Sequence, residues 1–329
     1  MRAVVITDTS NRSVSIEDVA DPTPGDDEVL VDVKACGVNF TDFLSLDGKY
    51  QNNPEPPFTP GKDAAGIVSA VGANVSNHKV GDRVIAHVIF GGMAEKTVCP
   101  AALAFSLPDG VEFDAAAAMG LAYLTGYLAL TRRGQMSEGE VVMINGASGG
   151  VGLASVSLAK ALGAKTVLAG LTTPSKGDAV KAAGADAIID LTVDDLKDNL
   201  RAQVMAATDK HGVDLAFDLV GGEVFDSTLR AIANEGRVVV SGFTSGTIPA
   251  VRTNYLLLKN ISVVGSTINY YIKDGSPLIG EAQAALYDLL LARKVDPNIM
   301  NRLPFDQYMD GIKALEERKI VGKSVLLMD

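Results

Sequence analysis

The stretch Val141-Val-Met-Ile-Asn-Gly-Ala-Ser-Gly-Gly-Val-Gly-Leu-Ala-Ser-Val-Ser-Leu-Ala-Lys-Ala-Leu-Gly163 is an apolar run, a glycine-rich turn and a helical pattern in unbroken order. Where a strand passes into a helix, several backbone N–H groups lack partners, and glycines there let a pyrophosphate approach closely. Ala147, Gly149 and Gly152 give Ala-x-Gly-x-x-Gly, a close variant of the dinucleotide fingerprint. The stretch therefore predicts a bound dinucleotide. The alternative is a tight strand-to-helix turn without a ligand.

On the C-terminal side of this turn, short apolar runs alternate with helical stretches, as a doubly wound parallel sheet requires. Together with the first run, they occupy residues 141–145, 166–171, 187–190, 215–220, 237–242 and 261–266. Six strands of a Rossmann domain are expected. Ligands bind such a sheet at the carboxyl ends of its strands, so residues at or just after the ends of the fourth and fifth strands are expected to border the cofactor: Val220, Ser241, Gly242 and Phe243.

The N-terminal third has a different sequence pattern, with short strand-like runs and no alternating helical stretches. Strand-like runs at residues 2–6, 28–34, 66–71, 82–88 and 94–98 are separated by Gly, Pro, Asn and Asp clusters, which is typical of an antiparallel, barrel-like unit. Residues from 114 to about 130 are alanine-rich and apolar, which predicts a helix that bridges two domains. The tail from residue 270 to 329 returns with two helical patterns and a last strand at 323–328.

Composition restricts the possible partners. The 329 residues carry a formal net charge of −11, which argues against nucleic acid as a partner because phosphate neutralisation needs clustered Lys and Arg. No apolar run is long enough to span a bilayer, and no secretory signal is visible at the N-terminus. Two cysteines, Cys36 and Cys99, cannot form a secreted-type disulfide framework. A reducing cytoplasm and a small-molecule substrate, with no membrane partner, are expected.

Several motifs, in order and spacing, resemble the zinc-independent quinone oxidoreductase branch of the medium-chain dehydrogenase/reductase superfamily. They include Ala35-Cys-Gly-Val-Asn-Phe-Thr-Asp42, Gly48-Lys-Tyr50, Gly61-Lys-Asp-Ala-Ala-Gly66, Gly81-Asp-Arg-Val84, Asn145-Gly-Ala-Ser-Gly-Gly-Val-Gly152 and Phe217-Asp-Leu-Val-Gly-Gly222. The resemblance implies an α/β protein with a GroES-like β-barrel catalytic domain at 1–120, completed by 267–329. It also implies a doubly wound parallel Rossmann domain for NADPH at 121–266, a cleft between the two, and homodimers paired through the coenzyme domain.

The residues after the second Rossmann strand favour NADPH over NADH. This segment reads Ala169-Gly-Leu-Thr-Thr-Pro-Ser-Lys176 and lacks the carboxylate that holds the ribose hydroxyls of NAD. The hydroxyls of Thr172 and Thr173 and the ammonium of Lys176 suit a 2′-phosphate instead. Relatives often place a tyrosine where this chain has Leu191. A solvated Lys176 in the first turn of the next helix is the alternative.

The remaining cofactor contacts follow from the glycine loop and from the resemblance. Thr125 is expected to face the nicotinamide. The loop residues expected to border the cofactor are Ala147, Ser148, Gly149, Gly150, Val151 and Gly152.

The resemblance also shows where zinc-dependent members hold their metal. Asn39 stands at the position of the first ligand, a cysteine, and Lys62 at the position of the second, a histidine. Neither an amide nor a protonated lysine replaces thiolate or imidazole on zinc, so no metal is expected. We hypothesise that the Lys62 ammonium supplies part of the lost charge and keeps Asp42 and Asp63 ionised. A partly exposed loop lysine is the alternative.

Without zinc, the acceptor must already be activated for hydride, as quinones and α,β-unsaturated carbonyls are. The oxyanion formed then needs a donor and a proton. Tyr50 and Asn39 are the first candidates, and Thr41 and Asp42 are secondary, because the hydroxyl of Thr41 matches a proton-relay position in zinc-dependent relatives. Tyr50 as a hydrophobic wall and Asn39 as a helix cap are the structural alternatives.

The sequence thus predicts an NADPH:quinone oxidoreductase-like enzyme, a zinc-independent medium-chain reductase. Two other functions stay open. An enoyl-thioester or 2-alkenal reductase would use the same hydride chemistry on the same framework. A non-catalytic NADPH-binding protein, like the lens crystallins of this branch, would keep the fold without turnover.

Overall fold

The computed structural model describes residues 1–273 and 276–328 of the chain. Residues 274–275 and 329, which fall within the segment 267–329 expected to complete the catalytic domain, lie outside the described residues. The chain divides into two compact units. Unit 1 comprises Met1–Ala122, Tyr271–Leu291 and Pro297–Asp329, and unit 2 comprises Tyr123–Tyr270 and Ala292–Asp296. Whether 1–120 with 267–329 and 121–266 are separate domains stays a prediction.

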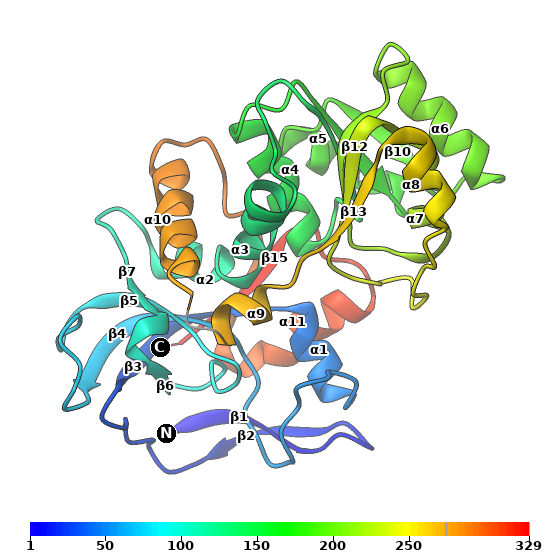
Figure 1. Ribbon diagram of the computed structural model, residues 1–329. Coiled ribbons are helices and arrows are strands. Elements are labelled where there is room, and N and C mark those ends of the chain that lie inside the picture. The colour runs from blue at the N-terminus through cyan, green and yellow to red at the C-terminus, as the bar shows by residue number, and fades with distance from the viewer. Residues whose placement is uncertain (274–275, 329) are drawn as a thin grey trace. The chain divides into compact units, whose positions relative to one another are not determined.

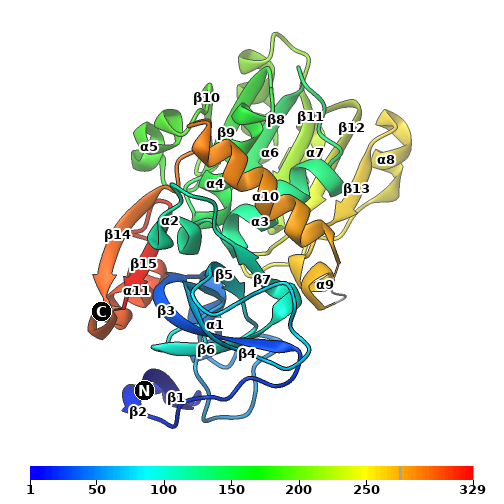
Figure 2. The ribbon, with the colours of Figure 1, turned by 90° about the vertical axis from the view of Figure 1, so that its left-hand side faces the viewer.

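Unit 2 contains a six-stranded parallel sheet, whose strands Figure 2 shows side by side in the order β10-β9-β8-β11-β12-β13. In chain order this is 3-2-1-4-5-6, the strand order of the Rossmann fold, which confirms the expected class. The strands are β8 (Val141–Asn145), β9 (Thr166–Leu171), β10 (Ala187–Asp190), β11 (Val213–Asp218), β12 (Ile232–Val240) and β13 (Ser262–Gly265).

Helices cover this sheet because its strands are apolar on both sides. Alternate strand residues such as Met143 and Leu168 pack in one cluster with α6 and α7, while α4 contacts β8 and β9. The helices are α3 (Leu121–Leu128), α4 (Gly150–Ala161), α5 (Gly177–Ala182), α6 (Leu196–Ala207), α7 (Gly222–Ala231), α8 (Thr253–Lys259) and α9 (Ile268–Lys273). The first two residues of α3 and the last three of α9 belong to unit 1.

Unit 1 is built on a seven-stranded, mainly antiparallel sheet and a separate β1–β2 hairpin, drawn in dark blue in Figure 1. The last strand, β15, pairs with β14 on one side and β3 on the other. The elements are β1 (Arg2–Asp8), β2 (Ser13–Asp18), β3 (Glu28–Val38), α1 (Phe40–Leu46), β4 (Asp63–Val71), β5 (Arg83–His87), β6 (Lys96–Pro100), β7 (Ala104–Ser106), α2 (Phe113–Ala118), α10 (Leu278–Leu291), β14 (Ile299–Pro304), α11 (Tyr308–Glu316) and β15 (Lys323–Leu327).

The bridging helix expected at 114–130 is two helices, α2 and α3, with a break at Met119 and Gly120. The break has a physical cause. The Asp63 carboxylate lies so close that a Cβ on Gly120 would be 2.4 Å from Asp63 Oδ1. The same oxygen accepts a hydrogen bond of 2.8 Å from Leu121 N at the start of α3. A buried carboxylate therefore takes a backbone donor that a continuous helix would use internally.

None of the helices within residues 1–273 and 276–328 is both long and apolar enough to cross a bilayer.

Candidate functional site

The glycine loop joins β8 to α4 in unit 2. Gly146 has φ +77°, which favours glycine. A Cβ on Gly152 would lie 2.1 Å from Gly146 O, so the first turn of α4 folds tightly against the loop. Gly149, at the N-cap of α4, has only Gly146 O near its would-be Cβ, at 3.7 Å. The outer side of the loop is thus open, and the first N–H groups of α4 have no intrahelical acceptors. This arrangement fits an anion.

A buried polar cluster lies beneath the loop. Asn145 Nδ2 donates to Asp218 Oδ1 at 3.0 Å and to Thr228 Oγ1 at 2.9 Å. Asp218 Oδ2 accepts from Gly221 N at 2.9 Å. Burial raises the pKa of Asp218, against the opposing effect of its bond from Asn145. The cluster joins the carboxyl ends of β8 and β11 to α7. The sequence analysis overlooked Asn145 and Thr228, although an asparagine that ends an otherwise apolar strand is a signal.

The expected 2′-phosphate turn follows β9. Gly170 of β9 stands opposite Asn145 of β8 in the parallel register, so this turn and the glycine loop leave the same edge of the sheet. Thr172 is exposed, and Thr173 and Lys176 are half-buried. Lys176 ends a short 3-10 helix, Pro174–Lys176, just before α5. Leu191 is buried.

The segments after β11 and β12 reach this edge as well. Asp218 pairs with Asn145 on one side and Val240 on the other. The two following loops are linked by backbone bonds from Thr244 N to Leu219 O and from Ser245 N to Val220 O, at 3.1 and 3.0 Å. The structure therefore brings together Val220, Ser241, Gly242 and Phe243 with the glycine loop. Ser241 Oγ donates to Ser266 O, Phe243 is exposed, and Thr125 lies half-buried on α3.

In unit 1, Asn39 is the N-cap of α1, and both the nitrogen and the oxygen of its side-chain amide are hydrogen-bonded. Its Nδ2 donates to Asp63 Oδ2 at 2.8 Å and to Gly37 O at 3.2 Å. Its Oδ1 accepts from Lys323 Nζ at 2.7 Å. Both amide hydrogens are thus used inside the protein, which disfavours direct donation from Asn39 to a substrate. Its part in the reaction stays a prediction.

Asp42 and Asp63 are both buried, and their pKa values shift in opposite directions. Burial raises the pKa of Asp42, and the charge of Lys62 is the strongest opposing effect. Burial would also raise the pKa of Asp63, but a bond from His87 and the charge of Lys323 hold it below its usual value. Lys62 therefore favours the ionised form of Asp42. The ionised form of Asp63 is favoured by Lys323 and not, as we had expected, by Lys62.

Lys62 is 5% exposed and lies among aromatic rings. Its Nζ is 4.5 Å from the centre of the Tyr50 ring and 4.3 Å from that of Phe90, and it donates to Ile89 O at 2.5 Å. The Tyr50 and Phe90 rings meet edge to face. The lysine is thus buried, contrary to the alternative of an exposed loop position. It holds a cation at the face of the candidate proton donor, Tyr50.

Thr41 lies in the first turn of α1, and its Oγ1 is buried with no hydrogen-bond partner among the described residues. Thr41 and Asp42 lie on α1, which runs into the loop that carries Tyr50, and Tyr50 N donates to Leu44 O of α1 at 3.2 Å. Two residues that the sequence analysis missed complete the cluster. Lys323 is first in β15, and His87 Nδ1 is 3.5 Å from Asp63 Oδ1.

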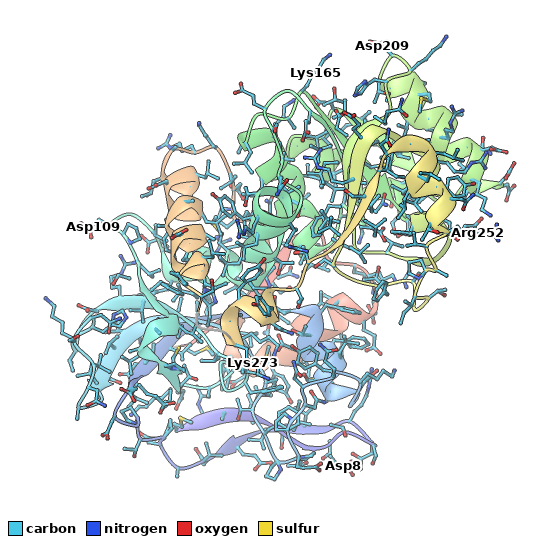
Figure 3. The ribbon with its side chains drawn as sticks, in the orientation of Figure 1. Asp8, Asp109, Lys165, Asp209, Arg252 and Lys273 are labelled. Atoms are coloured by element: carbon cyan, nitrogen blue, oxygen red, sulfur yellow. The ribbon has the colours of Figure 1, made fainter. Side chains whose placement is uncertain are left out.

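Another hollow of about 390 Å³ lies at the amino ends of β8 and β9 in unit 2. Its lining includes Lys165 and Asp209, both labelled in Figure 3. Since dinucleotides bind at the carboxyl edge of such a sheet, this hollow is not the cofactor site. No three potential metal ligands of the His, Cys, Asp and Glu types come together in the described parts of the chain.

Two family models match the chain, the alcohol dehydrogenase GroES-like domain at residues 25–109 and the zinc-binding dehydrogenase at residues 150–283. A quinone oxidoreductase-like protein 2 homolog from Nematostella vectensis is 35% identical over 99% of this chain and 88% of its own length. The chain therefore belongs to the medium-chain dehydrogenase/reductase superfamily, in its quinone oxidoreductase branch.

Solved structures agree. The mycobacterial protein Rv1454c complexed with NADPH is 30% identical, with a TM-score of 0.89 over 99% of this chain and 100% of that one. The Escherichia coli quinone oxidoreductase complexed with NADPH is 27% identical, with a TM-score of 0.86 over 99% and 100%. As a class, the chain is an oxidoreductase-family protein with a GroES-like unit and a Rossmann unit.

Proposed function

We propose that the chain is a reductase that uses NADPH to deliver hydride to quinones or activated α,β-unsaturated carbonyls, without zinc. The observation that carries this proposal is the buried Lys62 ammonium against the Tyr50 ring. It stands at the position where zinc-dependent relatives have a histidine ligand. A cation there repels a metal ion instead of binding one, and leaves hydrogen bonding to polarise the acceptor.

Two lines of support favour NADPH as the cofactor. The similar mycobacterial and Escherichia coli proteins were solved with NADPH. In this chain the open glycine loop fits a pyrophosphate, and Thr172, Thr173 and Lys176 offer hydroxyls and a cation to a 2′-phosphate. Replacing Lys176 by Ala should raise the KM for NADPH by about tenfold and leave the KM for NADH unchanged, since only NADPH carries that phosphate. Equal KM values for both cofactors in the unaltered protein would contradict the assignment.

In the proposed reaction the bound cofactor supplies a hydride and its electron pair. The acceptor carbonyl oxygen becomes an oxyanion, and a proton completes the reduced product. The Tyr50 phenol is the proposed donor to that oxygen, and the Lys62 ammonium over its ring keeps a positive charge beside the donor. Asp42 and Thr41 are proposed to support the proton supply, and Asn39 to fix the start of α1.

NADPH oxidation at 340 nm tests this function directly. We expect turnover with 9,10-phenanthrenequinone and 2-cyclohexenone. Turnover confined to crotonyl-CoA would favour the enoyl-thioester reductase, and tight NADPH binding without any turnover would favour a non-catalytic protein. Dialysis against a metal chelator should leave the rate unchanged, and a loss that zinc restores would contradict zinc independence.

We also propose that the protein forms a homodimer through unit 2 in a reducing cytoplasm. β13 is the edge strand of its sheet, and apolar side chains of the neighbouring α8 are exposed, notably Leu257 and Leu258. Both cysteines, Cys36 and Cys99, are buried free thiols, which suits a reducing compartment.

A further inference from the structure

Lys323 is a buried lysine that the reaction described so far does not use. It begins β15, and only 3% of it is exposed. Its Nζ donates to Val38 O at 2.9 Å and to Asn39 Oδ1 at 2.7 Å. Burial lowers the pKa of Lys323, against the opposing charges of Asp63 and Asp42. An ammonium is costly to bury unless its hydrogens are bonded and a counter-charge is near, so this position demands an explanation.

The lysine fixes which way the Asn39 amide points. An ammonium accepts no hydrogen bond, so the atom facing Lys323 must be the amide oxygen. The nitrogen then faces Asp63 Oδ2 at 2.8 Å, where an ionised carboxylate requires a donor. Asp63 is held in turn by Leu121 N at 2.8 Å and by His87. Asn39 thus bridges a buried cation and a buried anion, and neither end of its amide is free to turn.

The fixed asparagine sets the position of α1. Asn39 N donates to Asp42 Oδ2 at 2.8 Å, and Asp42 Oδ1 accepts from Gly61 N at 3.1 Å, which places Asp42 between the start of α1 and the segment leading to Lys62. At the far end of α1, Leu44 O accepts from Tyr50 N at 3.2 Å. A displacement of Asn39 is therefore transmitted through a two-turn helix to the backbone of Tyr50.

We infer that Lys323 is a positioning residue for the acceptor side of the site, acting through Asn39 and α1 on Tyr50. The inference rests on the proposed reductase function. It assigns a role in that reaction to the last strand of the chain, nearly three hundred residues from the loop that it orders. The glycine loop and the 2′-phosphate turn belong to unit 2, so removal of Lys323 acts on turnover and not on cofactor binding.

The test compares Lys323→Met and Lys323→Gln with Lys319→Met, which removes an exposed lysine of the same segment. We expect Lys323→Met to lower kcat about tenfold or more with quinone. The Kd for NADPH, from nicotinamide fluorescence, should stay within about twofold. Lys323→Gln keeps a donor for Asn39 Oδ1, so its kcat should lie between those of Lys323→Met and the unaltered protein. The kcat of Lys319→Met should equal that of the unaltered protein. An unchanged kcat, or an equal loss of kcat and NADPH affinity, would overturn the inference.

The pH profile separates positioning from a general loss of packing. The charged and titratable groups that surround Lys323 are Asp63, Asp42 and Cys36, with His87 and Lys62 beyond them. Lys323→Gln removes a charge that holds the pKa of Asp63 down, so the pH at which activity is lost on the acid side should rise. A profile of unchanged shape would indicate a merely structural lysine. Lys323→Gln alone decides the matter if Lys323→Met does not fold.

If the proposed function is wrong, the unaltered protein will turn over none of the acceptors, which differs from a loss confined to the Lys323 variants. The coupling between Lys323 and Asn39 can still be measured, from the free energies of unfolding of Lys323→Met, Asn39→Ala and the double variant. Residues that share a buried hydrogen bond give non-additive effects. Additive effects would overturn the link between Lys323 and Asn39 whatever the activity.

Discussion

Lys62 is the residue whose removal tests the site most simply. Its ammonium contacts two aromatic rings and Ile89 O, and each buried cation–π contact is worth about 0.5–2 kcal/mol. We expect Lys62→Met to lower the melting temperature and the rate of quinone reduction together, since Tyr50 loses its neighbouring charge. Thermal unfolding and NADPH oxidation measure both. Lys79→Met, an exposed lysine of unit 1, is the control. Full stability and full turnover in Lys62→Met would refute the role.

Tyr50 tests the proton donor. Tyr50→Phe keeps the ring that faces Lys62 and Phe90 and removes only the phenolic hydroxyl. General acid catalysis contributes about 10²–10⁴-fold, so a large fall in kcat is expected with little change in the KM for NADPH. Steady-state kinetics with a quinone decide the question. A kcat equal to that of the unaltered protein would leave Tyr50 as a wall of the site.

For single residues, the sequence predicts which side chains form the site better than it predicts the hydrogen bonds between them. Asn39, Asp42 and Lys62 stand in recognisable motifs, so their grouping can be expected. Lys323 cannot be expected there, because it meets Asn39 only through the pairing of β15 with β3, 284 positions away in the chain. The sequence also does not show that both amide hydrogens of Asn39 are already used, because Asp63 and Gly37 accept them only in the folded chain.

At the scale of the element, two glycines of the β8–α4 turn differ in the space that a side chain would have. A Cβ on Gly152 would overlap Gly146 O at 2.1 Å, whereas one on Gly149 finds its nearest atom at 3.7 Å. Gly152→Ala should therefore destabilise the fold, by about 1–3 kcal/mol for overpacking. Gly149→Ala should fold normally and bind NADPH more weakly, because its methyl group occupies the open side of the loop. Chemical denaturation and fluorescence titration separate the two effects.

Gly149→Ala and Gly152→Ala serve as controls for each other, because both add one methyl group to the same turn. If Gly149→Ala bound NADPH as tightly as the unaltered protein, the pyrophosphate would not lie on that side of the loop. A fully stable Gly152→Ala would show that α4 can shift away from Gly146, contrary to the close packing described above.

The strands of the unit 2 sheet were predicted from the sequence because each contains an apolar run, whereas β2 and β14 were not predicted. All six strands of the unit 2 sheet are apolar runs that can be recognised. β2 and β14 alternate between half-buried and exposed residues, with no fully buried position, so they lack that signal. The break between α2 and α3 depends on Asp63, which lies nearly sixty residues earlier in the chain.

At the scale of the whole molecule, acid should unfold the protein below about pH 4. The pKa of Asp63 is held low by His87, Lys323 and Asn39 against the effect of burial, and hydrogen bonds from the Arg2 side chain and backbone lower that of Glu95. A lowered native pKa stabilises the fold above the unfolded value, about 3.9 for Asp, and this stability is lost as the pH falls through the native pKa. The free energy of unfolding between pH 7 and pH 3 measures it.

Asp63→Asn isolates the largest buried contribution. This variant should be less stable at pH 7, because Lys323 and His87 lose their anion, and its stability should fall less steeply below pH 4. Asp42 acts in the other direction, since a raised native pKa disfavours the fold above the unfolded value. An acid dependence in Asp63→Asn as steep as that of the unaltered protein would show that other carboxylates dominate.

Association is the last property that belongs to the molecule as a whole. Among the described residues β13 pairs with β12 alone and ends the sheet, and an edge strand of this kind is a template for pairing with a second copy. Beside it, Leu257 and Leu258 are 78% and 76% exposed, so apolar side chains next to this edge are available to a second copy. Sedimentation velocity should give about twice the 34.3 kDa of one chain. Leu258→Asp should shift the protein to monomer, while Val80→Asp, on an apolar residue of unit 1 that is 62% exposed, should not. A monomeric unaltered protein would refute pairing through unit 2.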